Sequence, residues 1–207
     1  MRGMQSLKDA GRGAFKGMAH FDGEHHLSLS RANGPWSFQT DLAAEMFAIR
    51  SANLGMSQEF ALQKIERSSV MIDQFIGYCE TPIEKFLLPW LVFADYGPSI
   101  LTAPAKIHYL KDNDAPPDCD IFICPQFDFA TYRLDFAIFY KRGNSTQVVC
   151  VECDGSEFHD RSNDNKRDMT LARYGVPTVR VTGREIHASP ILAASRVANA
   201  VLYGIGG

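Results

Sequence analysis

The chain has 207 residues, of which 45% are hydrophobic, and its formal charge is −3 at pH 7. This size is enough to bury one core, and no apolar run of about 18 residues is present to predict a membrane span. The small negative charge gives no general attraction to nucleic acid but leaves local attraction open. An odd number of cysteines, five, and the lack of an apolar signal segment predict reduced thiols and a cytoplasmic protein.

The first third of the chain is predicted to form a tail followed by two helices. Residues 1–35 are rich in Gly, Ser and His without a sustained period, which predicts an irregular extension. A helix is predicted from a cap at Thr40-Asp41 to about Gly55, and a second helix from Ser57 to Gly77. We expect residues 1–78 to form an N-terminal addition that packs on a main domain of residues 79–207.

The main domain is predicted to begin with a helix at Thr81-Pro82-Ile83-Glu84. Thr81 suits the N-cap, Pro82 the first helical position and Glu84 the third, which together complete a capping box. Pro89 interrupts the apolar run that follows, and is expected to kink or shorten this helix.

The rest of the chain alternates between strand and helix patterns. Strands are predicted near residues 104–110, 120–126, 130–140 and 147–154, with a loop over 112–120 and a turn over 142–145. A helix over 162–174, a strand over 177–182 and a helix from Ser189-Pro190 to about Tyr203 follow. This order predicts an α/β sandwich around a mixed central sheet.

Three acids lie in two strands that are expected to be neighbours. Glu152 and Asp154 project to the same side of their strand, and Asp135 lies within Leu134-Asp135-Phe136 of the other strand. Arg133, Asp135 and Ala137 are predicted on one face, and Leu134, Phe136 and Ile138 on the opposite, apolar face. Crowded acids repel one another unless a positive group lies between them, so these acids indicate either a buried ion pair or a site for a hard divalent cation.

Neighbouring residues allow both structural and functional interpretations. Cys150 and Cys153 are spaced like a zinc pair, but an odd offset in a strand sends them to opposite faces, so both are predicted to fill space. Glu84 is explained by helix capping alone. His159, just beyond Gly155, is either a surface residue or a group that reaches a substrate phosphate.

Positive charge gathers after the acids. Residues 79–132 carry three Lys or Arg against eight Asp or Glu, whereas residues 133–207 carry ten against eight. This pattern fits a solvated helix face, and it also fits a surface for a phosphodiester substrate. The basic residues concerned are Arg161, Lys166, Arg167, Arg173, Arg180 and Arg184.

Taken in order, these motifs resemble the PD-(D/E)xK nuclease superfamily, and most of all its short endonuclease-like domains related to very-short-patch-repair nucleases. The resemblance covers about Thr81 to Tyr203. Its motifs are Thr81-Pro82-Ile83-Glu84, Tyr132-Arg133-Leu134-Asp135-Phe136, Val151-Glu152-Cys153-Asp154-Gly155 with His159, Lys166-Arg167-Asp168 with Leu171 and Gly175, and Val179-Arg180-Val181.

The resemblance implies a restriction-endonuclease-like three-layer sandwich and a metal-dependent nuclease acting on DNA. Asp135, Glu152 and the carbonyl of Cys153 would hold Mg²⁺ or Mn²⁺, with Glu84 as an accessory acid and Asp154 as a further catalytic acid. The lysine that the superfamily usually has two residues after the second acid is replaced by Asp154 here.

A substitute for that lysine is expected from Lys166, or second from His159. A charged lysine would stabilise phosphate charge rather than act as a base. Arg161, Lys166, Arg167, Arg180 and Arg184 would contact the phosphates of DNA.

Two rival interpretations stay open on the sequence. The chain could be a nuclease-fold protein that binds DNA or a protein partner without cutting, which the missing lysine and the N-terminal helices favour. It could also be an α/β domain that acts on a different phosphate ester. No base-reading module is visible, so we expect weak sequence specificity or targeting by a protein partner.

Overall fold

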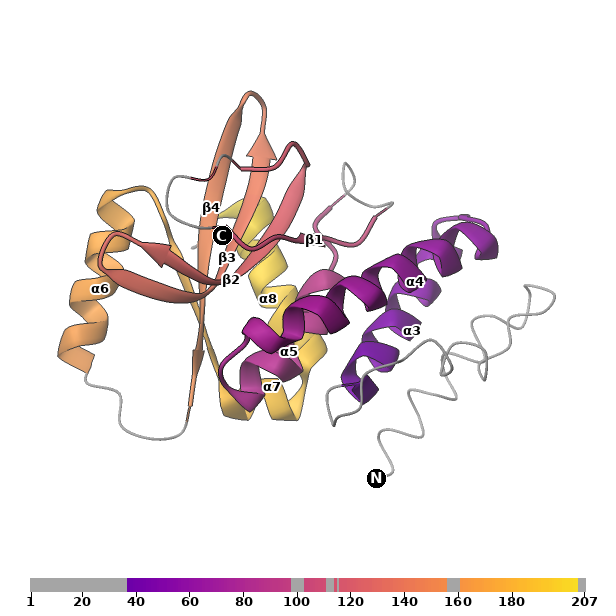
Figure 1. Cartoon of the computed structure of the whole chain (residues 1–207), viewed down its shortest axis with the longest axis horizontal. Coiled ribbons are helices and arrows are strands. Elements are labelled where there is room, and N and C mark those ends of the chain that lie inside the picture. The colour runs from indigo at the N-terminus through magenta and orange to yellow at the C-terminus, as the bar shows by residue number, and fades with distance from the viewer. Residues whose placement is uncertain (1–36, 98–102, 111–113, 115, 156–160, 205–207) are drawn as a thin grey trace.

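A computed structural model describes residues 37–97, 103–110, 114, 116–155 and 161–204 (Figure 1). The tail predicted over residues 1–35 lies outside this part of the chain. The strands are β1 (Lys106–Ile107), β2 (Ile121–Phe129), β3 (Tyr132–Arg142), β4 (Ser145–Asp154) and β5 (Thr178–Thr182). The helices are α3 (Ser37–Asn53), α4 (Gln58–Phe75), the 3₁₀ turn η1 (Ile76–Tyr78), α5 (Pro82–Val92), α6 (Arg161–Arg173), α7 (Gly183–Ala188) and α8 (Pro190–Tyr203).

The strands form one five-stranded sheet in the order β1-β2-β3-β4-β5. The pairs β2–β3 and β3–β4 are antiparallel, whereas β1–β2 and β4–β5 are parallel. The parallel pair β4–β5 is connected through α6, as a parallel connection requires a crossover. The predicted α/β class with a mixed sheet is therefore confirmed.

Local signals explain where several helices begin. The Ser57 side chain accepts a hydrogen bond from the Phe60 N–H at the start of α4, and Thr81 and Glu84 form the predicted capping box of α5. Pro89 lies inside α5, which continues to Val92, so Pro89 does not end the helix. The predicted cap at Thr40 is wrong, because α3 already begins at Ser37.

Helix α7 is the element that the sequence analysis missed. It has only six residues and follows β5 directly, so its apolar period is too short to recognise. Thr182 and Glu185 nevertheless form a second capping box at its start, and this Thr-x-x-Glu spacing was a usable signal.

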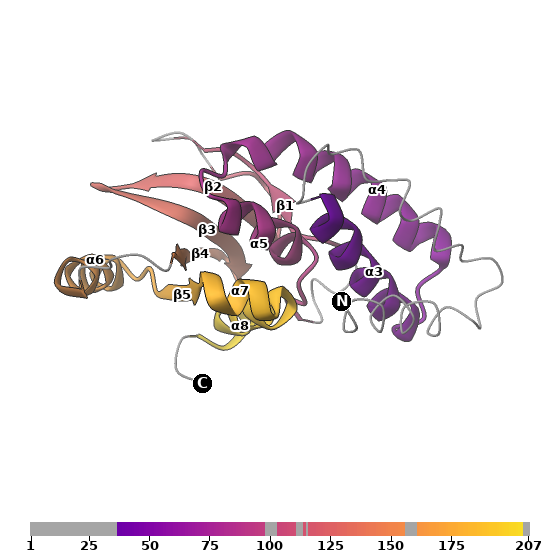
Figure 2. The same cartoon turned by 90° about the horizontal axis from the view of Figure 1, so that it is seen from below.

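Apolar side chains cover both faces of the sheet. The larger cluster joins alternate strand residues such as Phe136, Ile138 and Val151 to the helices α3, α4, α5, α7 and α8. A smaller cluster on the other face joins Ala137 and Cys150 to Leu171 of α6. Figure 2 shows α6 apart from the other helices, in agreement with this division.

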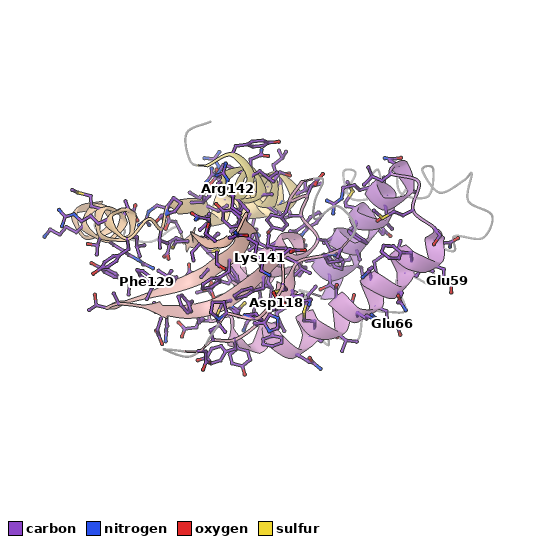
Figure 3. All side chains as sticks on the ribbon, turned by 90° about the horizontal axis from the view of Figure 1, so that it is seen from above. Glu59, Glu66, Asp118, Phe129, Lys141 and Arg142 are labelled. Atoms are coloured by element: carbon purple, nitrogen blue, oxygen red, sulfur yellow. The ribbon has the colours of Figure 1, made fainter. Side chains whose placement is uncertain are left out.

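The N-terminal helices share the larger cluster. Phe47 of α3 and Ile65 and Ile72 of α4 are fully buried in it together with Leu87 of α5. The acids Glu59 and Glu66 lie along the outer side of α4 (Figure 3). The two helices thus pack on the body of the protein as expected, and the boundary after residue 78 stays a prediction. None of the helices in the described ranges is long and apolar enough to cross a membrane.

Candidate functional site

The strands β3 and β4 separate at the position of the predicted acids. Their last paired residues are Phe136 and Val151. Beyond this pair, the Cys153 N–H donates a hydrogen bond to Oδ2 of Asp135 at 2.7 Å. The Asp135 side chain thus takes the place of the β3 carbonyl that would accept this bond in a continuous ladder. Asp135 and Glu152 therefore lie beside each other at the point where the sheet forks.

The regular alternation of β3 is broken at this fork. Leu134 packs in the smaller cluster with Ala137, whereas Phe136 packs in the larger one. An unbroken strand would direct Leu134 and Phe136 to the same face, so the predicted placing of Leu134 with Phe136 is wrong. On the neighbouring strand β2, Gln126 lies between the paired residues Pro125 and Phe127 and has a positive φ of 51°, which marks a local departure from extended backbone.

Glu152 is buried with a side chain from α6. The residue is 5% exposed, and Oε1 accepts a hydrogen bond from the Cys150 thiol at 3.2 Å. The same oxygen forms an ion pair with Nη2 of Arg167. Arg167 Nη2 also donates to the Arg133 carbonyl at 2.8 Å, and its guanidinium carbon lies 5.7 Å from the centre of the Tyr132 ring. Arg167 thus contacts both arms of the fork.

Burial dominates the electrostatics of the two acids. Loss of hydration raises the pKa of Asp135 to about 6, although the hydrogen bond from Cys153 acts in the opposite direction. The pKa of Glu152 is raised to about 7, first by loss of hydration and then by the negative charge of Asp135, while Arg167 acts to lower it. The charge of Asp135 thus acts on Glu152 as a close like charge, and the charges of Glu84 and Asp154 act in the same way on Asp135. A bound cation would relieve this repulsion.

Glu84 reaches the edge of this site from α5. It is 2% exposed, and Oε1 accepts from the Thr81 N–H at 3.2 Å and from the Thr81 hydroxyl at 2.6 Å. Oε2 accepts from the Glu80 N–H at 2.9 Å and from Gln126 Nε2 at 2.8 Å. Both oxygens of Glu84 are thus engaged by protein donors, as the capping interpretation requires.

Gln126 is a member of this group that the sequence analysis did not identify. Its contact with Glu84 joins residues 42 positions apart, which no local pattern reveals. Pro125 before it was the available signal, because a proline inside a strand marks a place where regular pairing changes.

Replacing Gln126 by glycine is expected to leave the protein about 1 kcal/mol more stable than replacing it by alanine. Both variants lose the hydrogen bond to Glu84, but only the alanine variant has a Cβ that is strained at a φ of 51°. Chemical denaturation of the two variants measures the difference. Equal stability of the two would contradict a strained backbone at this position.

Asp154 lies outside the pair of Asp135 and Glu152 and contacts Arg180 of β5. Nη1 of Arg180 is 3.0 Å from Asp154 Oδ1. The same guanidinium binds both oxygens of Asp168 on α6, at 3.1 Å through Nε and at 3.0 Å through Nη2. Arg180, which was predicted to contact phosphates, therefore joins β4, β5 and α6 in this structure.

The other predicted residues are distributed around the fork. Lys166 is exposed on α6, while the adjacent Arg167 turns inward to Glu152. Arg184 is exposed on α7. His159 and the side chain of Arg161 lie outside the described residues. Cys150 and Cys153 belong to opposite faces as predicted.

The donors at the fork fit a hard divalent cation in type and charge. Asp135 and Glu152 supply carboxylate oxygens, which are the ligands that Mg²⁺ and Mn²⁺ prefer. Both carboxylates are also partly removed from water, so a cation would offset the cost of burying their charge. Within the described ranges, no three or more His, Cys, Asp and Glu side chains are arranged to hold a metal ion. The two acids alone would supply only part of the ligands of such an ion.

Comparison of the chain with models of protein families, with curated proteins and with solved structures found no match in any of the three.

Proposed function

We propose that this protein is a metal-dependent nuclease of the PD-(D/E)xK type, which hydrolyses phosphodiester bonds in DNA during repair, restriction or the processing of mobile-element or phage DNA. The observation that supports this proposal is the placing of Asp135 and Glu152 beside each other where β3 and β4 diverge. Both carboxylates have raised pKa values from burial, a state that a divalent cation would reverse.

The architecture is compatible with a restriction-endonuclease-like sandwich. A mixed five-stranded sheet carries the two acids on its third and fourth strands, with helices on both faces. The acids lie at an end of the β3–β4 ladder and not in its middle.

In this proposal each residue has a separate task. Asp135 and Glu152 would hold Mg²⁺ or Mn²⁺, which would supply a water of lowered pKa and stabilise charge on the phosphate. The Cys153 N–H fixes the orientation of Asp135. Exposed Lys166 and Arg184 are available to bind phosphates of the DNA backbone.

A cleavage assay on supercoiled plasmid and linear DNA tests the proposal. We expect cleavage with Mg²⁺ or Mn²⁺ and none with EDTA, and a loss of at least about 100-fold in Asp135→Asn and Glu152→Gln. Glu66→Gln is the matched control, since it removes an exposed acid on the outer side of α4. The enzyme proposal would be contradicted if wild type cut DNA under none of these conditions. It would also be contradicted if Asp135→Asn and Glu152→Gln cut as well as wild type.

A second candidate function is binding of DNA or a protein partner without cleavage. Two ion pairs favour it. The charge of Glu152 is already paired with Arg167. Asp154, which stands where the usual lysine would be, is paired with Arg180. Retention of DNA in a mobility-shift assay, with no cleavage in any metal, would support this alternative.

A further inference from the structure

Arg167 is the positive group that the structure places against the two acids. Its Nη2 contacts Glu152 Oε1 and donates to the Arg133 carbonyl at 2.8 Å, so that it spans the fork between β3 and β4. The side chain is 20% exposed, against 6% for that of Glu152. This is an ion pair largely withdrawn from solvent, in which each partner depends on the other for compensation of its charge.

The position of Arg167 is fixed by the next residue of α6. Asp168 receives two parallel hydrogen bonds from Arg180 of β5, a geometry that restrains both distance and orientation. Arg180 also binds Asp154 on β4. Leu171 is the residue of α6 in the smaller apolar cluster, and one apolar contact restrains the rotation of a helix only weakly. The contacts of Asp168 with Arg180 therefore help to fix which side of α6 faces the sheet.

A divalent cation on Glu152 would compete with this arrangement. The guanidinium and the ion would share one carboxylate within a few ångströms of each other, in a region of low hydration where like charges repel strongly. Arg167 also has a buried Nε for which the described residues supply no hydrogen-bond acceptor, so part of the guanidinium is incompletely satisfied in its present place.

We infer that Arg167 and a divalent cation compete for Glu152, so that Arg167 weakens the affinity of the site for metal and is displaced from Glu152 when the ion binds. Lys166, although next to it in sequence, takes no part in this competition because it lies on the exposed side of α6. The inference rests on the metal-binding part of the proposed function and requires no cleavage of DNA.

Titration of the full chain with Mn²⁺, followed by calorimetry and by the electron paramagnetic resonance of free Mn²⁺, tests the inference. We expect Arg167→Gln to bind Mn²⁺ about tenfold more tightly than wild type, within the usual range for two coupled ligands. Arg167→Lys, which keeps a charge, should lie between them, and Lys166→Gln, which removes the neighbouring charge, should match wild type. Equal or weaker binding by Arg167→Gln, or no binding by any of these proteins, would overturn the inference.

A crystal of the wild-type protein grown without metal and then soaked in Mn²⁺ gives a test that does not depend on a variant folding. We expect an anomalous peak at Asp135 and Glu152 with the Arg167 guanidinium moved away from Glu152. An ion at Glu152 with the Arg167 contact unchanged would overturn the inference, as would the absence of a peak. Failure of the nuclease proposal is a separate result, because it would appear as metal binding without cleavage.

Discussion

The free energy of unfolding is expected to rise as the pH falls from about 8 to about 5 in metal-free buffer. Burial raises the pKa of Asp135 to about 6 and that of Glu152 to about 7, both above the values of these groups in an unfolded chain. The folded protein therefore binds protons in this range that the unfolded chain does not. For Glu152 the shift from 4.5 corresponds to about 3 kcal/mol, present in full below about pH 4.5 and lost as the pH rises through about 7.

Denaturant unfolding of wild type and Glu152→Gln across this pH range measures the effect. The variant should show a flatter dependence, because the glutamine does not titrate. Burial and the charge of Lys106 lower the pKa of His108, so this residue makes the folded protein less stable as the pH falls. Because His108 is present in both proteins, its effect cancels in the difference in unfolding free energy between wild type and Glu152→Gln. Saturating Mg²⁺ should also flatten the wild-type curve by favouring the ionised acids. Identical slopes for wild type and Glu152→Gln would contradict the raised pKa.

Replacing Glu84 by alanine is expected to lower the free energy of unfolding by roughly 3 kcal/mol. The change removes four hydrogen bonds to a buried carboxylate, leaves Gln126 without its acceptor and deletes half of the capping box of α5. Glutamine at this position keeps one acceptor oxygen, but its amide would face donors, so we expect an intermediate loss.

Thermal and urea unfolding of Glu84→Ala, Glu84→Gln and Glu80→Ala tests this expectation. Glu80 is the matched control because it is a neighbouring acid whose ion pair with Arg133 is about half exposed, and such pairs contribute about 1 kcal/mol or less. A loss in Glu84→Ala no larger than in Glu80→Ala would show that the cap and the bond to Gln126 contribute little.

Most of the fold could be predicted because its signals are local. The cap at Ser57, the capping box at Thr81, the turn near Gly143 and the strand runs on either side of it depend on residues close in sequence. The start of α3 and the short α7 were missed because the local sequence pattern is weak at both places. Ser37 lies close to a segment with no sustained period, and six residues are too few to establish one.

The site was harder to predict because it depends on a broken strand and on the rotation of one helix. The fork at Asp135 and the contact of Gln126 with Glu84 arise from tertiary packing, so strict alternation placed Leu134 wrongly. On α6, neighbouring residues differ in direction by about 100°. That helix is strongly polar, so its sequence did not indicate that Arg167 and not Lys166 would face the acids.

The attachment of α6 makes its local stability depend on dissolved ions. Its described inward contacts include one fully buried aliphatic side chain, Leu171, and ion pairs from Arg167 and Asp168 to the sheet. Salt screens the partly exposed pair of Asp168 with Arg180 more than the buried pair of Arg167 with Glu152, and it does not screen apolar packing. The backbone amides of α6 should therefore exchange with deuterium sooner than those of α5 or α8, and high ionic strength should widen the gap.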